Sequence, residues 1–124
     1  MSAYDDANPF AEILRGERSC DAVFENTYAL AFRDIRPQAP THILAIPKGR
    51  YVSLDDFAWN ACSAEIGAFL AAVRSVGRAP ELAGGYRVIV NTGPDARQTV
   101  PHFHMHILGG RDLGPKLLPG LSAP

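Results

Sequence analysis

The chain of 124 residues has the length of one ordinary domain, and with 47% hydrophobic and 20% charged residues its composition is that of a globular protein. A fibrous repeat and a largely disordered chain are thereby excluded. The net charge of -1 gives no broad basic surface, so we expect no nucleic acid held through many phosphates, although a few local donors are enough to bind a small anion.

The cysteines and the N-terminus predict the compartment. Cys20 and Cys62 stand alone, which indicates neither a disulfide framework nor a zinc motif. The opening MSAYDDANPF carries acids where a secretory signal has lysines and an apolar run, and no stretch reaches the roughly 18 apolar residues of a membrane span. We therefore expect a cytoplasmic protein with no membrane partner.

A short helix and a hairpin are predicted first. Asn8 and Pro9 suit the N-cap and first position of a helix, and Gly16 suits its end. The two apolar runs in AVFENTYALAF, residues 22–32, predict a hairpin that turns at residues 25–27.

A third strand and a long central helix follow. THILAIP, residues 41–47, reads as a strand. Ser53 and Asp56 resemble a capping box, and the helix is expected to end near Gly77. Its inner face is expected to carry the residues that recur at helical spacing, namely Trp59, Cys62, Ile66, Phe69, Leu70, Val73 and Val76.

Two last strands complete the predicted sheet. They are YRVIV, residues 86–90, and HFHMHIL, residues 102–108. Short links between successive strands indicate an α+β domain with an antiparallel five-stranded sheet, one short N-terminal helix and one long central helix. We expect a single domain over residues 1–124, with irregular tails at residues 1–7 and 116–124.

Three of the four histidines alternate along the last of these strands. Successive strand side chains point to opposite faces, so His102, His104 and His106 are expected to share one face. A lone histidine on such a face is usually a satisfied buried residue. Three in register are harder to explain in this way, because each needs its own buried partner.

Two chemical interpretations of the three histidines compete. In the first, His-x-His directs two nitrogens at a metal ion, for which His42 and Asp34 are the available further ligands. In the second, one neutral imidazole attacks phosphorus while its neighbours orient it and bind the phosphate oxygens. The loop before the strand supplies neutral donors for that phosphate, namely Asn91, Gln98 and Thr99.

The motif HFHMHIL resembles the His-x-His-x-His-x-x pattern of the histidine triad (HIT) superfamily. Four blocks, NPFAEILRGE, AFRDIRPQAPTHILAIPK, GYRVIVNTG and HMHILGGRDLGP, are similar in order and spacing to its Hint branch of nucleotide phosphoramidate hydrolases, over most of residues 8–115. The resemblance implies a HIT-like fold and a homodimer formed through the long helix and the YRVIV strand. It also implies an enzyme without cofactor or metal that cleaves AMP-like purine nucleoside 5'-phosphoramidates or acyl-nucleotides.

The resemblance assigns roles to individual residues. His104 would be the nucleophile that forms a nucleotidyl-histidine, His102 would orient and polarise the site, and His106 would contact the α-phosphate or the leaving group. It further places His42 in the imidazole network, and Asn91 and Thr99 beside the phosphate with the neighbouring donor Gln98. Asp34 would bind the ribose hydroxyls. The purine would be surrounded by Phe10, Ile13, Phe32 and Ile35.

Alternatives to these roles stay open in the sequence. His42 reads equally well as a structural histidine, Asp34 as a cap of the turn before Pro37, and the four apolar residues as core. The whole chain is also compatible with a nucleotide-binding or scaffolding protein that has little catalytic role. It departs from the branch at Arg97, where a glycine often stands, and at Pro101, where a tyrosine often stands.

Overall fold

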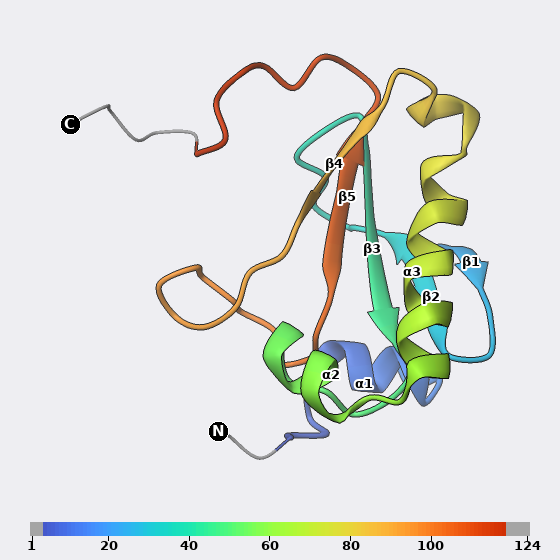
Figure 1. Ribbon diagram of the computed structural model, residues 1–124, viewed down its shortest axis with the longest axis vertical. Coiled ribbons are helices and arrows are strands. Elements are labelled where there is room, and N and C mark those ends of the chain that lie inside the picture. The colour runs from blue at the N-terminus through green and yellow to red at the C-terminus, as the bar shows by residue number, and fades with distance from the viewer. Residues whose placement is uncertain (1–3, 119–124) are drawn as a thin grey trace.

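An antiparallel sheet of five strands, in the order β1-β2-β3-β5-β4, organises the computed structural model (Figure 1). The structure describes residues 4–118. The elements are α1 (Pro9–Leu14), β1 (Ala22–Glu25), β2 (Ala29–Arg33), β3 (Thr41–Pro47), α2 (Leu54–Asn60), α3 (Ser63–Gly77), the 3-10 turn η1 (Pro80–Leu82), β4 (Tyr86–Ile89) and β5 (Met105–Gly109). The α+β class and the five-stranded antiparallel sheet expected from the sequence are confirmed.

Asn26 closes the hairpin between β1 and β2. Its side-chain oxygen accepts hydrogen bonds from the N–H groups of Tyr28 (3.0 Å) and Ala29 (2.9 Å). These bonds from the asparagine side chain stabilise the turn, so no glycine is needed after it. Its amide nitrogen also donates to the carbonyl of Ala68 in α3, at 2.9 Å. One side chain therefore fixes both the turn and its distance from the helix.

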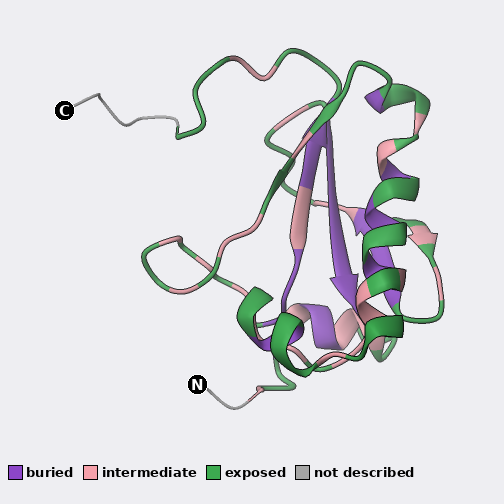
Figure 2. Ribbon diagram, in the orientation of Figure 1, coloured by how far each residue is buried: buried purple, intermediate pink, exposed green. Residues whose placement is uncertain are grey.

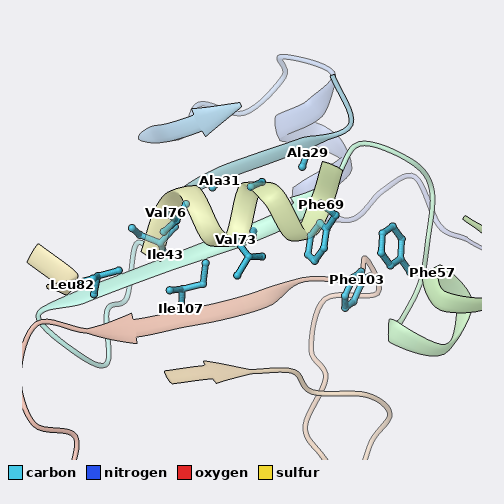
Figure 3. Close-up of a cluster of buried hydrophobic side chains, with 12 residues drawn as sticks. Ala29, Ala31, Ile43, Phe57, Phe69, Val73, Val76, Leu82, Phe103 and Ile107 are labelled. Atoms are coloured by element: carbon cyan, nitrogen blue, oxygen red, sulfur yellow. The ribbon is translucent and has the colours of Figure 1, made fainter. Parts of the chain in front are cut away.

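The two faces of the sheet are covered by different helices. All residues of β3 are buried, as expected for a central strand with both faces covered (Figure 2). Figure 3 shows α3 lying across one face, where Phe69 and Val73 pack over Ile43 and Ile107. On the opposite face Phe10 of α1 packs with the alternate residues Leu30, Phe32, Leu44 and Ile46.

The structure divides the expected long helix into α2 and α3. Ala61 and Cys62 are extended, and the Cys62 N–H donates to the Glu65 side chain at 3.2 Å, so Glu65 caps a second helix start. The break changes the phase of the apolar stripe, which leaves Trp59 at 85% exposure. Of the expected inner face, Phe69, Val73 and Val76 are buried, Ile66 is half-buried, and Trp59, Cys62 and Leu70 are exposed. Within residues 4–118, none of the helices has the length and apolarity needed to cross a bilayer.

The hydrogen-bonded part of the last strand is shorter than the sequence pattern indicates. The last pair of the β3–β5 ladder joins Ala45 to Met105, and Pro47, two residues further along β3, has no N–H to extend it. The Phe103 N–H instead donates to the carbonyl of Tyr51, at 2.7 Å. His102, which lies in a bend, and His104 therefore precede β5, and the Pro47 carbonyl is free to accept from a side chain.

Candidate active site

His102 is fully buried and held at both ring nitrogens. Its Nε2 lies 2.8 Å from the carbonyl oxygen of Pro47, which can only accept, so Nε2 carries the proton. Its Nδ1 then accepts the hydroxyl of Tyr4, at 2.5 Å. The Tyr4 hydroxyl in turn accepts the side-chain amide of Asn8, at 3.1 Å. The tautomer and the orientation of His102 are thereby fixed.

The backbone of His102 fixes the tautomer of His104. The His104 Nδ1 lies 2.7 Å from the carbonyl oxygen of His102, so Nδ1 carries the proton and Nε2 keeps a lone pair. Within residues 4–118 that Nε2 makes no hydrogen bond, and the ring packs edge-on to Phe10 with centroids 5.0 Å apart. His104 therefore offers an oriented, unprotonated nitrogen with an apolar ring at its side.

His42 and His106 form a second ordered pair. The backbone N–H of Gln38 donates to Nδ1 of His42 at 3.1 Å, which leaves the His42 proton on Nε2. That Nε2 lies 2.9 Å from Nδ1 of His106 and donates to it. The His106 proton must then reside on Nε2, because Nδ1 is accepting. The arrangement gives His106 a free N–H donor beside the ring of His104, with the two centroids 5.1 Å apart.

Burial keeps all four imidazoles neutral near pH 7. Loss of hydration, opposed by the hydrogen bond to the Pro47 carbonyl and aided by the neighbouring His104, lowers the pKa of His102 to about 4. Burial, followed by the proximity of His104 and His42, lowers the pKa of His106 to about 4. Burial also lowers the pKa values of His104 and His42, against a smaller opposite effect of Asp34. A neutral His104 keeps the lone pair that nucleophilic attack requires.

These pKa shifts predict a fold that weakens in mild acid. Because the folded-state pKa of His102 is lowered from 6.5 to about 4, the unfolded chain binds the proton first as pH falls. Stability is therefore complete above pH 6.5 and is lost progressively as pH falls toward 4. The free energy of unfolding in urea should be about 2 kcal/mol or more lower at pH 5 than at pH 7.5, a range in which unfolded carboxyl groups stay ionised. A flat profile over this range would contradict the buried neutral network.

A pocket of about 400 Å³ opens beside His104 and His106. The strands supply one part of its wall, and the loop between β4 and β5 supplies another. Its lining residues are Gln38, His42, Ile89, Asn91, Arg97, Thr99, His104, His106 and Leu108. A larger hollow of about 610 Å³ lies around η1, the start of β4 and residues 110–113. Because its lining contains no histidine, the smaller pocket is the better candidate for the chemistry.

The expected phosphate donors fall into two groups. Asn91 and Thr99 line the histidine pocket, although the Asn91 amide nitrogen also donates to the Ala96 carbonyl at 2.8 Å. Gln98 instead holds the loop together. Its amide oxygen accepts the Gly93 N–H at 3.2 Å, and its amide nitrogen donates to the carbonyls of Val52 and Val100 at 2.7 and 3.1 Å. In this structure the Gln98 side chain has no donor left for a phosphate.

The residues expected around the base and ribose do not all lie together in the structure. Phe10 and Phe32 are buried and pack edge to face, with centroids 5.6 Å apart, and Ile13 is packed against their cluster. Ile35 stands apart at 89% exposure. Asp34 accepts the Arg36 N–H at 2.8 Å and has its other oxygen 3.5 Å from Nε2 of His42. Their contacts with a nucleotide stay predictions.

Asp34, His42 and His106 are also the residues that could hold a metal ion, since one ligand atom of each lies within 4.8 Å of the others. The hydrogen bonds of His42 oppose this use. A metal that binds Nε2 of His42 requires the proton on Nδ1, where it would face the N–H of Gln38. The chemistry of this cluster therefore fits a proton-ordered imidazole pair better than a metal centre.

Tyr4 is the contact residue that sequence reasoning missed, because it lies in the segment expected to be an irregular tail. Besides its bond to His102, its ring lies 5.1 Å from the guanidinium of Arg50, which pairs with Asp6 at 3.0 Å. The side chain is thus held at the site from several directions. Of the two expected tails, residues 1–3 and 119–124 lie outside the described residues.

Replacement of Tyr4 by phenylalanine should destabilise the fold and loosen His102. The change leaves Nδ1 of a fully buried imidazole without a partner, which costs about 1–3 kcal/mol. Thermal unfolding measures this loss, and long-range nitrogen–proton NMR spectra report the His102 tautomer. Tyr28→Phe, at an exposed position, is the matched control and should change neither quantity. Unchanged stability of Tyr4→Phe would show that the hydroxyl does not hold the ring.

Fold and site together define an α+β domain that presents four neutral, hydrogen-bonded histidines beside a pocket at one face of an antiparallel sheet. The model of the HIT domain family matches residues 15–113. A HIT-like protein of Azospirillum brasilense is 54% identical over 118 residues, covering 94% of this chain and 97% of that protein. The purine nucleoside phosphoramidase of Escherichia coli K12 is 41% identical over 109 residues, covering 87% of this chain and 91% of that protein.

A solved structure shows the same architecture. The HIT family hydrolase from Clostridium thermocellum superimposes with a TM-score of 0.82 at 36% identity, covering 91% of this chain and 98% of that one. The chain therefore belongs to the HIT domain family, as the sequence motif indicates.

Proposed function

We propose that the protein is a hydrolase that cleaves purine nucleoside 5'-phosphoramidates, or the related acyl-nucleotides, through a nucleotidyl-histidine intermediate. One observation carries the proposal. The His104 Nδ1–H bond to the His102 carbonyl leaves the Nε2 lone pair as the free nucleophile of the pocket. The similarity to the phosphoramidase of Escherichia coli supports the choice of substrate.

The first step forms the intermediate. The Nε2 lone pair of His104 attacks the α-phosphorus, and the phosphorus–nitrogen bond breaks with its electron pair going to the departing amine. The amine takes up one proton from solvent. The bond from Nδ1–H to the His102 carbonyl stabilises the positive charge that develops on the imidazole ring. The free Nε2–H of His106 is available to donate to a phosphoryl oxygen or to the departing nitrogen.

The second step returns the enzyme to its starting state. Water attacks the phosphorus, the bond to His104 Nε2 breaks, and its electron pair returns to the ring. The water loses one proton, which replaces the proton taken up in the first step. Substrate and water thus give the mononucleotide and the free amine, with no cofactor required.

Turnover of an adenosine 5'-phosphoramidate tests this function against a nucleotide-binding role. We expect the purified protein to release AMP with saturable kinetics and to bind AMP as a product. AMP binding without turnover of any member of a panel of adenosine and guanosine phosphoramidates would favour the binding protein instead. A stoichiometric bound metal, with activity lost to a chelator, would favour the metal alternative.

We also propose that two copies pair through β4. This strand is at the edge of the sheet, with β5 as its single neighbour, and its Tyr86, Val88 and Ile89 are 44%, 38% and 37% exposed. An apolar edge strand of this kind favours pairing with another strand. Light scattering at micromolar concentration should give twice the chain mass of 13.4 kDa, and Val88→Lys should shift the mass toward one chain. A single-chain mass for the unmodified protein would overturn the pairing.

The cytoplasmic location stays a prediction.

A further inference from the structure

Arg97 lines the histidine pocket in an unusual backbone conformation. Its φ of 64° lies in the left-handed region, and among residues 4–118 no other non-glycine residue has a positive φ. The loop fixes this conformation, since the Arg97 N–H donates to the Pro94 carbonyl at 3.0 Å and the Gln98 N–H donates to the Gly93 carbonyl at 3.1 Å. A glycine would adopt it without strain, so the local fold alone does not call for an arginine.

The charge of Arg97 is not balanced within the described part of the chain. No ion pair or side-chain hydrogen bond of its guanidinium occurs there, and no acidic residue lines its pocket. An adjoining hollow of about 470 Å³ shares Gln38, Ile89 and Leu108 with the pocket and continues past Arg111 and Lys116, again without an acidic residue. The groove that leads away from the histidines is therefore positive.

The course of the reaction connects this charge to the leaving group. Displacement at phosphorus is roughly in line, so the departing group leaves on the side opposite the attacking His104. Arg97 and Thr99 line the same pocket as His104 and His106, and they come from an earlier part of the connection between β4 and β5. We assign the departing group to the part of the pocket that Arg97 lines.

We propose that Arg97 forms a subsite for a leaving group that carries a negative charge close to the scissile phosphorus–nitrogen bond. The inference rests on the proposed function and deepens it by specifying the class of substrate. Arg97 is exposed in the free protein. It acts as a specificity-determining residue, since a guanidinium that pairs with a carboxylate or phosphate favours such substrates over neutral ones.

Two matched substrates test the subsite. They are AMP joined through nitrogen to glycine, which carries a carboxylate, and AMP joined to glycinamide, which has nearly the same shape without the charge. The ratio of their kcat/KM values is compared between the unmodified protein and Arg97→Asn, because asparagine tolerates a left-handed backbone. Comparing the ratios cancels the intrinsic difference between the two amines.

We expect Arg97→Asn to lower the glycine-to-glycinamide ratio at least fivefold, equivalent to about 1 kcal/mol at 1.4 kcal/mol per tenfold. Arg97→Lys should keep most of the preference. Arg74→Gln, which removes the same charge from an exposed position of α3 on the other face of the sheet, should leave the ratio unchanged. Added salt should reduce the preference of the unmodified protein.

Binding gives a readout that does not depend on turnover. In the His104→Ala background both compounds stay intact, and calorimetry should show that Arg97→Asn weakens the glycine compound several-fold more than the glycinamide compound. An equal loss of binding affinity for both compounds would identify Arg97 as a general phosphate contact and overturn the subsite. If the unmodified protein hydrolyses both compounds without a charge preference, the subsite is refuted and the hydrolase is retained. If it binds the glycine compound preferentially but hydrolyses neither compound, the hydrolase is refuted and the subsite is retained.

Discussion

His104→Ala should lower the turnover of an adenosine phosphoramidate by at least about a thousandfold while AMP still binds with similar affinity. The reason is that the substitution removes the Nε2 lone pair that forms the bond to phosphorus, and each tenfold in rate corresponds to about 1.4 kcal/mol of transition-state stabilisation. Most other pocket contacts stay in place, so ground-state binding changes little. Steady-state kinetics together with AMP titration separates the two effects.

Loss of the fold must be excluded as the cause of this loss of activity. His104 makes one backbone hydrogen bond and ring contacts with Phe10 and His106, so a modest change in thermal stability is expected. Far-UV circular dichroism and retained AMP binding identify a folded variant. Turnover by a folded His104→Ala protein at the rate of its parent would remove His104 from the mechanism.

Phe103→Ala should cost about 3–5 kcal/mol of unfolding free energy. The ring is 1% exposed, stacks on Phe57 with centroids 5.0 Å apart and lies 5.1 Å from Phe69, at the end of α3 that carries Phe69 (Figure 3). Truncation removes this burial and leaves a cavity in a well-packed cluster. Because Phe103 lies between His102 and His104 in the chain, we also expect activity to fall at temperatures where the variant is still folded.

Urea unfolding measures the change, with Ile35→Ala as the matched control. Ile35 is 89% exposed, so its truncation should alter stability by no more than about 0.5 kcal/mol. A Phe103→Ala loss as small as that of the control would contradict the packing of this core. If Ile35 instead contacts the purine, Ile35→Ala will weaken AMP binding without changing stability.

The pattern of the sequence is sufficient to find the histidines but not their protons. Alternation along the chain predicts that His102, His104 and His106 lie on the face opposite Phe103. The structure shows this alternation even before β5, where the strand ladder has ended. The tautomers depend on single acceptors and donors such as the Pro47 carbonyl and the Gln38 N–H. No periodic pattern encodes such contacts.

Three further features of the structure could not be predicted from the sequence, each for a physical reason. The start of α3 is hidden because a cysteine, Cys62, stands where a capping box usually shows serine or threonine. Tyr4 contacts His102 across 98 positions of the chain, a separation that no local pattern spans. Gln98 looks like a free donor in sequence, but its amide satisfies the backbone of its own loop and of Val52.

Mass spectrometry of a rapidly quenched reaction tests the central claim most directly. With a slowly turned-over adenosine phosphoramidate, the intact protein should transiently gain the mass of one adenylyl group, and peptide mapping should place it on His104. The adduct should be absent from His104→Ala and should disappear from the parent at the rate of AMP release. An adduct on another residue, or AMP release at full rate with no adduct at any quench time, would contradict attack by the Nε2 of His104.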